Sequence, residues 1–84
     1  MIEMIILDDI INNIKKEFER AVSKFGAFHN AHEGYAVLLE EVDELWENVK
    51  LNQKIPNRNE LIKEEAIQVA AMAVRLIYDC GRKD

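Results

Sequence analysis

The sequence predicts an all-α protein of three helices, and three observations lead to this fold class. Apolar residues recur at spacings of three and four, the period of an α-helix, in three separate stretches. Two short breaks, from Ala27 to His32 and from Asn52 to Asn59, separate these stretches, and the second break contains the only proline. The chain has no internal repeat and no low-complexity tract, so its 84 residues are expected to form a single domain, 1–84.

The first helix is expected from about Asp8, or from an earlier residue, to Lys24. Asp8 is a suitable N-cap, because its carboxylate can accept a hydrogen bond from a free N–H of the first turn. The apolar stripe of this helix has the spacing of three and four and consists of Ile11, Ile14, Phe18, Ala21 and Phe25. Gly26 then ends the helix as a C-cap glycine.

The second helix is expected from about Ala31 to Leu51. Its apolar face consists of Tyr35, Leu38, Leu39, Val42, Leu45, Trp46 and Val49. Because Trp46 belongs to this face, packing is favoured for it over stacking on a bound base. The third helix is expected from about Glu60 to Asp79, with Asn59 as its N-cap and Gly81 as its stop.

The third helix is unusually apolar. Only Gln68 and Arg75 are polar from Ala66 to Tyr78, and a helix that is apolar nearly all round is buried on most sides. A chain this short buries only about 60–65% of its unfolded surface, although 49% of its residues are hydrophobic. We therefore expect a helical bundle that is completed by homo-oligomerisation, as a homodimer or a homotetramer.

The charge and cysteine content restrict the partners and the compartment. The formal net charge of −5 argues against a nucleic acid or an anionic membrane as the main partner. Cys80 is the only cysteine, so no disulfide can form within the chain and a reducing cytoplasm is the expected location. The apolar start from Met1 to Leu7 lacks a basic leader, and we expect neither a secretion signal nor a membrane span there.

The run from Glu40 to Glu44 places four acidic side chains within five residues of the second helix. A helix turns by about 100° per residue, so Glu41 borders the apolar face and Glu44 lies next to it, one turn further on. Glu40 and Asp43 point towards solvent. Two carboxylates at positions i and i+3 can share one cation, although the common explanation of such a run is a solvated helix face.

The third helix carries a single polar stripe, formed by Glu65, Gln68, Met72, Arg75 and Asp79. Packed against the second helix, Glu65 and Gln68 would meet Glu41 and Glu44. Three carboxylates and one amide then supply the hard oxygen ligands that Mg²⁺ or Mn²⁺ favours, on facing helices of a bundle. Gln68 has an alternative role, which is to hydrogen-bond across a dimer interface and fix its register.

These residues carry a resemblance to the MazG-like, all-α nucleoside triphosphate pyrophosphohydrolases. That family pairs a Glu-Glu-x-x-Glu motif on one helix with a Glu-x-x-Asp motif on the next. The first motif is complete here as Glu40-Glu41-Val42-Asp43-Glu44, and the second reads Glu65-Ala66-Ile67-Gln68, with Gln in place of Asp. The resemblance extends from about Ala31 to Asp79.

The resemblance implies metal ligands at Glu41, Glu44 and Glu65, with Gln68 at the fourth ligand position and Glu40 as a possible helper for the attacking water. It implies an enzyme that hydrolyses a nucleoside triphosphate to the monophosphate and pyrophosphate, with Mg²⁺ as cofactor. The missing charge at Gln68 should weaken metal binding or bring in a water. The competing interpretation is a non-catalytic helical interaction module of the same fold.

Other polar residues have both a functional and an ordinary explanation. Lys54 and Arg58 flank the second break and could receive phosphate oxygens, but charged loops commonly serve solubility. Arg75 could contact substrate, although pairing with an acid near the helix end is favoured. His29 and His32 have a spacing that occurs in zinc sites, yet no cysteine or further histidine lies near them in the sequence.

Overall fold

The computed structural model describes residues 2–82 of the chain, and the side chains of residues 5–82. Its elements are three α-helices and a terminal π-helical turn, namely α1 (Ile2–Phe25), α2 (Ala31–Val49), α3 (Arg58–Leu76) and η1 (Ile77–Gly81). No strand occurs among the described residues. The all-α class with three helices is therefore confirmed.

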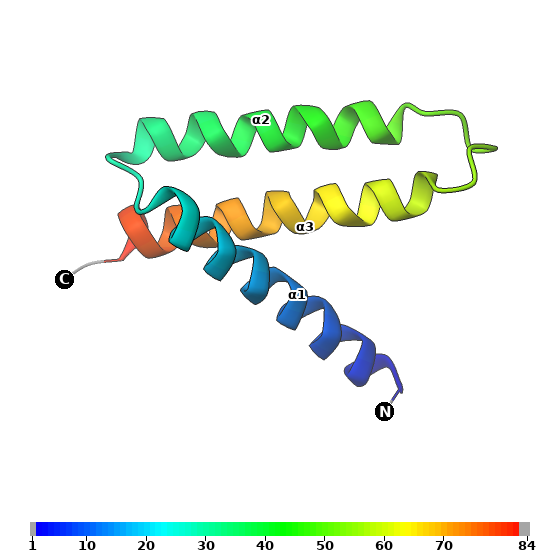
Figure 1. The fold of residues 1–84 in the computed structure, drawn as a ribbon, viewed down its shortest axis with the longest axis horizontal. Coiled ribbons are helices and arrows are strands. Elements are labelled where there is room, and N and C mark those ends of the chain that lie inside the picture. The colour runs from blue at the N-terminus through cyan, green and yellow to red at the C-terminus, as the bar shows by residue number, and fades with distance from the viewer. Residues whose placement is uncertain (1, 83–84) are drawn as a thin grey trace.

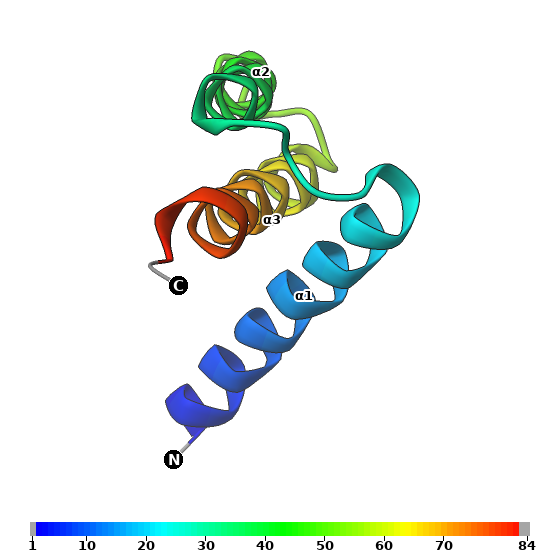
Figure 2. The same ribbon diagram turned by 90° about the vertical axis from the view of Figure 1, so that its left-hand side faces the viewer.

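The central element of the fold is α3. It runs antiparallel beside α2, while α1 crosses it on the other side and diverges towards the N-terminus (Figures 1 and 2). Helix α3 contacts both of the other helices, which agrees with its apolar sequence. One chain nevertheless leaves part of α3 uncovered, since Val74 is 39% exposed.

The start of α1 differs from the predicted N-cap. The helix begins at Ile2, so Asp8 lies within it and does not cap it. The preceding residues contain neither proline nor glycine, and nothing in them interrupts a helix. The end agrees with the prediction, because Gly26 has φ +73° and donates its N–H to the Val22 carbonyl at 2.8 Å.

Helix α2 begins at Ala31 as predicted, whereas the N-cap predicted for α3 is wrong. Helix α2 begins after Asn30, whose side-chain oxygen accepts the N–H of Glu33 at 2.9 Å. Helix α3 begins at Arg58, so Asn59 lies inside the helix and the preceding Asn57 makes no capping hydrogen bond through its side chain. The Arg58 N–H donates to the Ile55 carbonyl at 3.2 Å, and this turn leads directly into the helix before Asn59 is reached. Gly81 does end the last helical turn.

The buried core is small and lies where α1, α2 and α3 meet near the first connection. It consists of Ala21, Phe28, Ala71 and Met72, with Ile14, Val37, Leu38 and Leu76 packed against it. The packing expected for Trp46 is wrong for the single chain: the indole is 57% exposed, and the Lys50 ammonium lies 5.6 Å from its centroid. Much of the apolar face of α2 therefore faces solvent. Within the described residues, every helix lacks the length or the apolar character needed to cross a membrane.

Candidate metal centre

Three carboxylates converge where the middle of α2 faces α3. Glu41 and Glu44 extend from α2 and Glu65 extends from α3, and each offers an oxygen that lies within 4.8 Å of the other two. Ligands on opposite sides of a Mg²⁺ ion are separated by about 4.2 Å, so the cluster has the dimensions of a site for one cation. The convergence follows from helix geometry, because residues at i and i+3 share a face.

The environment of Glu65 disfavours its charged form. Burial, and then the nearby carboxyls of Glu41 and Glu44, raise the pKa of Glu65 to about 8. Its Oε1 atom is buried and has no hydrogen-bond donor among the described residues. A buried oxygen without a partner, beside two further carboxylates, fits a divalent cation with hard oxygen ligands.

The two helices are also tied together close to this cluster. Asn48, two turns after Glu41 on α2, donates its Nδ2–H to the Leu61 carbonyl of α3 at 3.1 Å. The Asn48 side chain is half-buried. This hydrogen bond fixes the register in which α2 and α3 present their carboxylates to each other.

Gln68 lies one turn beyond Glu65, between the cluster and α1. The Arg20 guanidinium lowers the pKa of the Glu17 carboxyl, and the Gln68 amide lowers it further, against the opposing effect of burial. An aspartate at position 68 would place a second negative charge beside Glu17. The neutral amide therefore suits this neighbour, and its own oxygen remains available as a ligand.

A cavity of about 520 Å³ adjoins the carboxylate cluster. It lies between the end of α1, the first connection, α2 and α3, and is lined by Arg20, Ala21, Phe25, Ala27, Phe28, His29, Glu33, Val37, Glu40, Glu41, Gln68, Met72 and Arg75. Glu41 belongs to both the cluster and the cavity wall. Glu40 is exposed, as predicted, and it also reaches this wall. The volume lies within the range of small-molecule sites.

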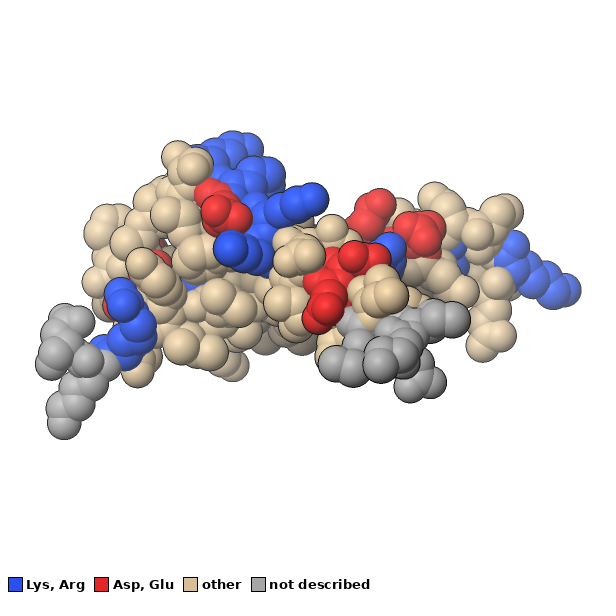
Figure 3. All heavy atoms as spheres, turned by 90° about the horizontal axis from the view of Figure 1, so that it is seen from below, with Lys and Arg blue, Asp and Glu red and all other residues tan. Residues whose placement is uncertain are grey.

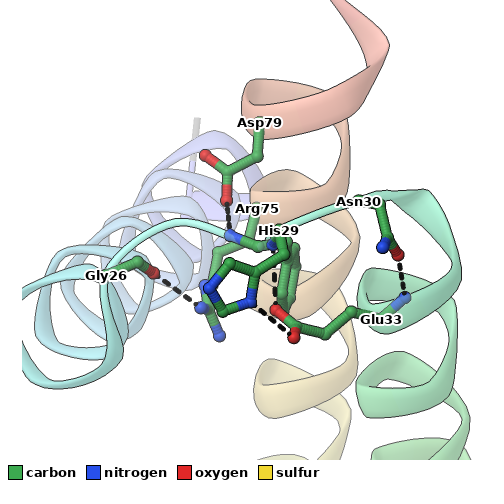
Figure 4. Close-up of polar contacts among 7 residues, drawn as sticks. Gly26, His29, Asn30, Glu33, Arg75 and Asp79 are labelled. Atoms are coloured by element: carbon green, nitrogen blue, oxygen red, sulfur yellow. Dashed lines mark hydrogen bonds and ion pairs between the residues drawn. The ribbon is translucent and has the colours of Figure 1, made fainter.

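Arg75 forms one wall of the cavity and holds the first connection against α3. Its side chain is 3% exposed, its guanidinium lies 4.1 Å from the centroid of the Phe28 ring, and its Nη2 donates to the Gly26 carbonyl at 3.0 Å. Asp79 accepts the Phe28 N–H at 2.9 Å (Figure 4). The expected pairing of Arg75 with an acid is therefore replaced by a backbone carbonyl and an aromatic ring.

The connection also carries an exposed ion pair. His29 Nδ1 lies 2.9 Å from Glu33, which also accepts the His29 backbone N–H at 3.0 Å (Figure 4). This contact raises the pKa of His29 and lowers that of Glu33. Among the described residues, His29 and His32 belong to no group of three metal-ligating side chains, so the geometry does not support the zinc interpretation.

The basic residues of the second break lie elsewhere. Arg58 donates from Nε to the Leu51 carbonyl at 2.9 Å and from Nη2 to the Val49 carbonyl at 2.8 Å, so it satisfies the open end of α2. Neither Lys54 nor Arg58 lines the cavity beside the carboxylates. Arg20, which the sequence analysis did not single out, does line it. The only sequence signal was its position off the apolar stripe, which also fits a solvated residue.

Comparison with known proteins gave no relatives: no protein-family model, no curated protein and no solved structure matches this chain.

Proposed function

We propose that this chain is a Mg²⁺-dependent nucleoside triphosphate pyrophosphohydrolase, which cleaves a (d)NTP to the (d)NMP and pyrophosphate. Mn²⁺ has the same ligand preference and is the alternative ion. The observation that carries the proposal is the approach of Glu41, Glu44 and Glu65 from two helices to within 4.8 Å of one another. The resemblance of their two motifs to the MazG-like family supports the same activity.

The three carboxylates would hold the metal, with the Gln68 oxygen or a water beside them. A divalent cation in such a site neutralises phosphate charge and lowers the pKa of a bound water. Glu40 lies on the cavity wall next to Glu41, where its carboxylate can accept a proton from the attacking water. The cavity then receives the part of the nucleotide that extends beyond the phosphates, against the apolar surface of Phe28 and Met72.

Of the basic side chains on the cavity wall, only some can reach an anionic substrate. Arg20 and His29 lie on its wall and are exposed, so they can turn towards phosphate oxygens. Arg75 is already engaged by Gly26 and Phe28, which assigns it a supporting role in this proposal. With a net charge of −5, the chain depends on the cation to bridge its carboxylates to a triphosphate.

Pyrophosphate release from a panel of NTPs and dNTPs with Mg²⁺ tests this function. Glu41→Gln removes a ligand charge and should lower the rate on the order of 100-fold, since a metal supplies several kcal/mol to the transition state. Asp43→Asn is the matched control, because Asp43 is exposed on the same helix and lies outside the cluster. No release from any nucleotide, or equal rates for both variants, would overturn the proposal.

A non-catalytic helical interaction module is the second candidate. The observation that favours it is the exposed apolar face of α2, with Tyr35 60%, Leu39 41% and Trp46 57% exposed. Calorimetric titration with Mg²⁺ separates the two candidates, because an interaction module does not require metal binding.

Self-association is compatible with both candidate functions. We propose that the chain forms a homodimer or homotetramer, since the apolar surface left open in one chain is large for a protein of 84 residues. A cytoplasmic location is proposed as well, because Cys80 is a free, exposed thiol and such thiols persist in reducing compartments.

A further inference from the structure

Helix α1 carries one apolar stripe along its whole described length. Its members follow one another at alternating spacings of four and three, and they are Leu7, Ile11, Ile14, Phe18, Ala21 and Phe25. This alternation is the heptad pattern by which two helices pack along a shared seam. The 24 residues of α1 extend over about 36 Å, which is long enough for such a seam.

Helix α3 covers only the middle of this stripe, and its last member, Phe25, is 64% exposed. Ala21 is 1% exposed and Ile14 packs against the core, whereas Leu7 is 54% and Ile11 is 53% exposed. Figures 1 and 2 show the reason, because α1 diverges from α3 towards its N-terminus. Half of a continuous seam is therefore left without a partner in the single chain.

An apolar groove opens beside this seam, between α1 and α3. Its volume is about 480 Å³, and it is lined by Ile11, Ile14, Lys15, Phe18, Glu19, Ala70, Val74 and Tyr78. Ala70 and Val74 of α3 and Tyr78 of η1 recur every fourth position and so form one ridge. The Phe18 and Tyr78 rings meet edge to face with centroids 5.4 Å apart. The only charged side chains in the lining are Lys15 and Glu19, both on α1.

We propose that α1 of a second copy of this chain lies antiparallel in this groove, so that the two seams pair about a two-fold axis between Ile11 and Ile14. Leu7 then lies opposite the partner's Phe18, and Ile11 lies opposite the partner's Ile14. Each exposed N-terminal half fills the groove of the other copy, and the arrangement closes as a dimer. The proposal specifies the self-association proposed above and is independent of nucleotide hydrolysis.

Charge complementarity selects a second copy as the occupant and antiparallel as the orientation. Asp8 and Lys15 lie on the same flank of the seam, two helical turns apart, or about 10.5 Å. Neither forms an ion pair with another described residue. In the antiparallel pair this flank lies against the same flank of the partner, so Asp8 meets the partner's Lys15 at both ends. In a parallel pair the two flanks lie on opposite sides of the seam, and Asp8 does not meet Lys15. On the face of the molecule that Figure 3 shows, basic side chains gather mainly in one cluster, with acidic side chains both within it and further along.

The seam is tested by sedimentation velocity of the whole chain without metal or nucleotide, over a range of concentrations. Leu7→Asn should convert the dimer to a monomer, and Ile6→Asn is its matched control. Ile6 is 53% exposed, like Leu7, but it lies about 100° from the seam. Circular dichroism checks that both variants stay helical. A wild-type monomer at all concentrations, or equal effects of the two substitutions, would overturn the proposal.

Charge reversal tests the orientation. Asp8→Lys and Lys15→Asp, each alone, place like charges at both ends of the antiparallel pair and should raise the dissociation constant on the order of tenfold. An equimolar mixture of the two variants should restore dimerisation, because each heterodimer then has two opposite-charge contacts. The double variant in one chain should restore it too. If the dissociation constant does not change in these variants, the dimer pairs through another face and the proposal is wrong. Intact metal binding in the same variants would leave the proposed function unaffected.

Discussion

Glu65 reaches from α3 to Glu41 on α2, and their carboxylate oxygens lie within 4.8 Å of each other, together with that of Glu44. Without a cation, this proximity and the burial of Glu65 raise its pKa to about 8. At neutral pH the free protein therefore keeps Glu65 protonated, which limits the repulsion within the cluster. The proposed metal site and this unusual proton-binding site therefore consist of the same three side chains.

The first prediction concerns stability against pH in the absence of divalent ions. Because the folded pKa of Glu65, about 8, exceeds its ordinary value of 4.5, its contribution to stability is complete below pH 4.5 and is lost as pH rises through about 8. Glu65→Gln keeps a neutral side chain throughout. The variant should match the wild type near pH 4.5 and exceed it above about pH 8 by about 1 kcal/mol, a value reduced for solvent screening.

Urea denaturation with a chelator, at several pH values, measures this difference. Glu64→Gln is the control, since Glu64 is exposed on the same helix and lies outside the cluster. It should show no such trend. A difference between Glu65→Gln and wild type that does not change with pH would show that Glu65 titrates normally.

The second prediction concerns Arg75. Its guanidinium is buried against Phe28 and bonded to Gly26, so Arg75→Met should lower the free energy of unfolding by about 2–3 kcal/mol. Arg82 offers a matched control: it stacks on Tyr78 at 4.0 Å and donates to a backbone carbonyl at 2.8 Å, but it is exposed. Arg82→Met should therefore lower it by less than about 1 kcal/mol. Equal losses would mean that burial of Arg75 adds nothing.

The third prediction separates a structural role of Arg58 from substrate binding. Arg58→Ala removes the hydrogen bonds to the Val49 and Leu51 carbonyls and should lower the free energy of unfolding by about 1–2 kcal/mol. The Michaelis constant for nucleotide and the affinity for Mg²⁺ should stay unchanged, because Arg58 is absent from the cavity wall. Lys54→Ala should change neither property. A raised Michaelis constant in either variant would show that this loop takes part in substrate binding.

Much of the fold follows from local sequence signals. The three helices follow from the period of the apolar residues. The end of α1 follows from Gly26, a residue type that tolerates a positive φ, and the central place of α3 follows from its apolar surface. The N-caps of α1 and α3 were predicted wrongly, because capping propensity is weak where neighbouring residues also favour the helix. Asp8 and Asn59 are good caps in residue type alone.

The candidate site was predictable to the same degree. The approach of Glu41, Glu44 and Glu65 follows from spacing within each helix once α2 and α3 pack face to face. Their depth and the lack of a partner for the Glu65 Oε1 atom depend on tertiary packing, and so does the engagement of Arg75. Gln68 illustrates the limit most clearly, since the Glu17 carboxyl whose pKa its amide lowers lies on another helix.

The central claim is that Glu41, Glu44 and Glu65 bind one divalent cation, and titration calorimetry with Mg²⁺ at about pH 7 tests it most directly. Because Glu65 must lose its proton to become a ligand, the account predicts one bound ion with release of about one proton, read from buffers of different ionisation enthalpy. Glu65→Gln should lose this binding and Asp43→Asn should keep it. No Mg²⁺ or Mn²⁺ binding, or binding that persists in Glu65→Gln, would contradict the account.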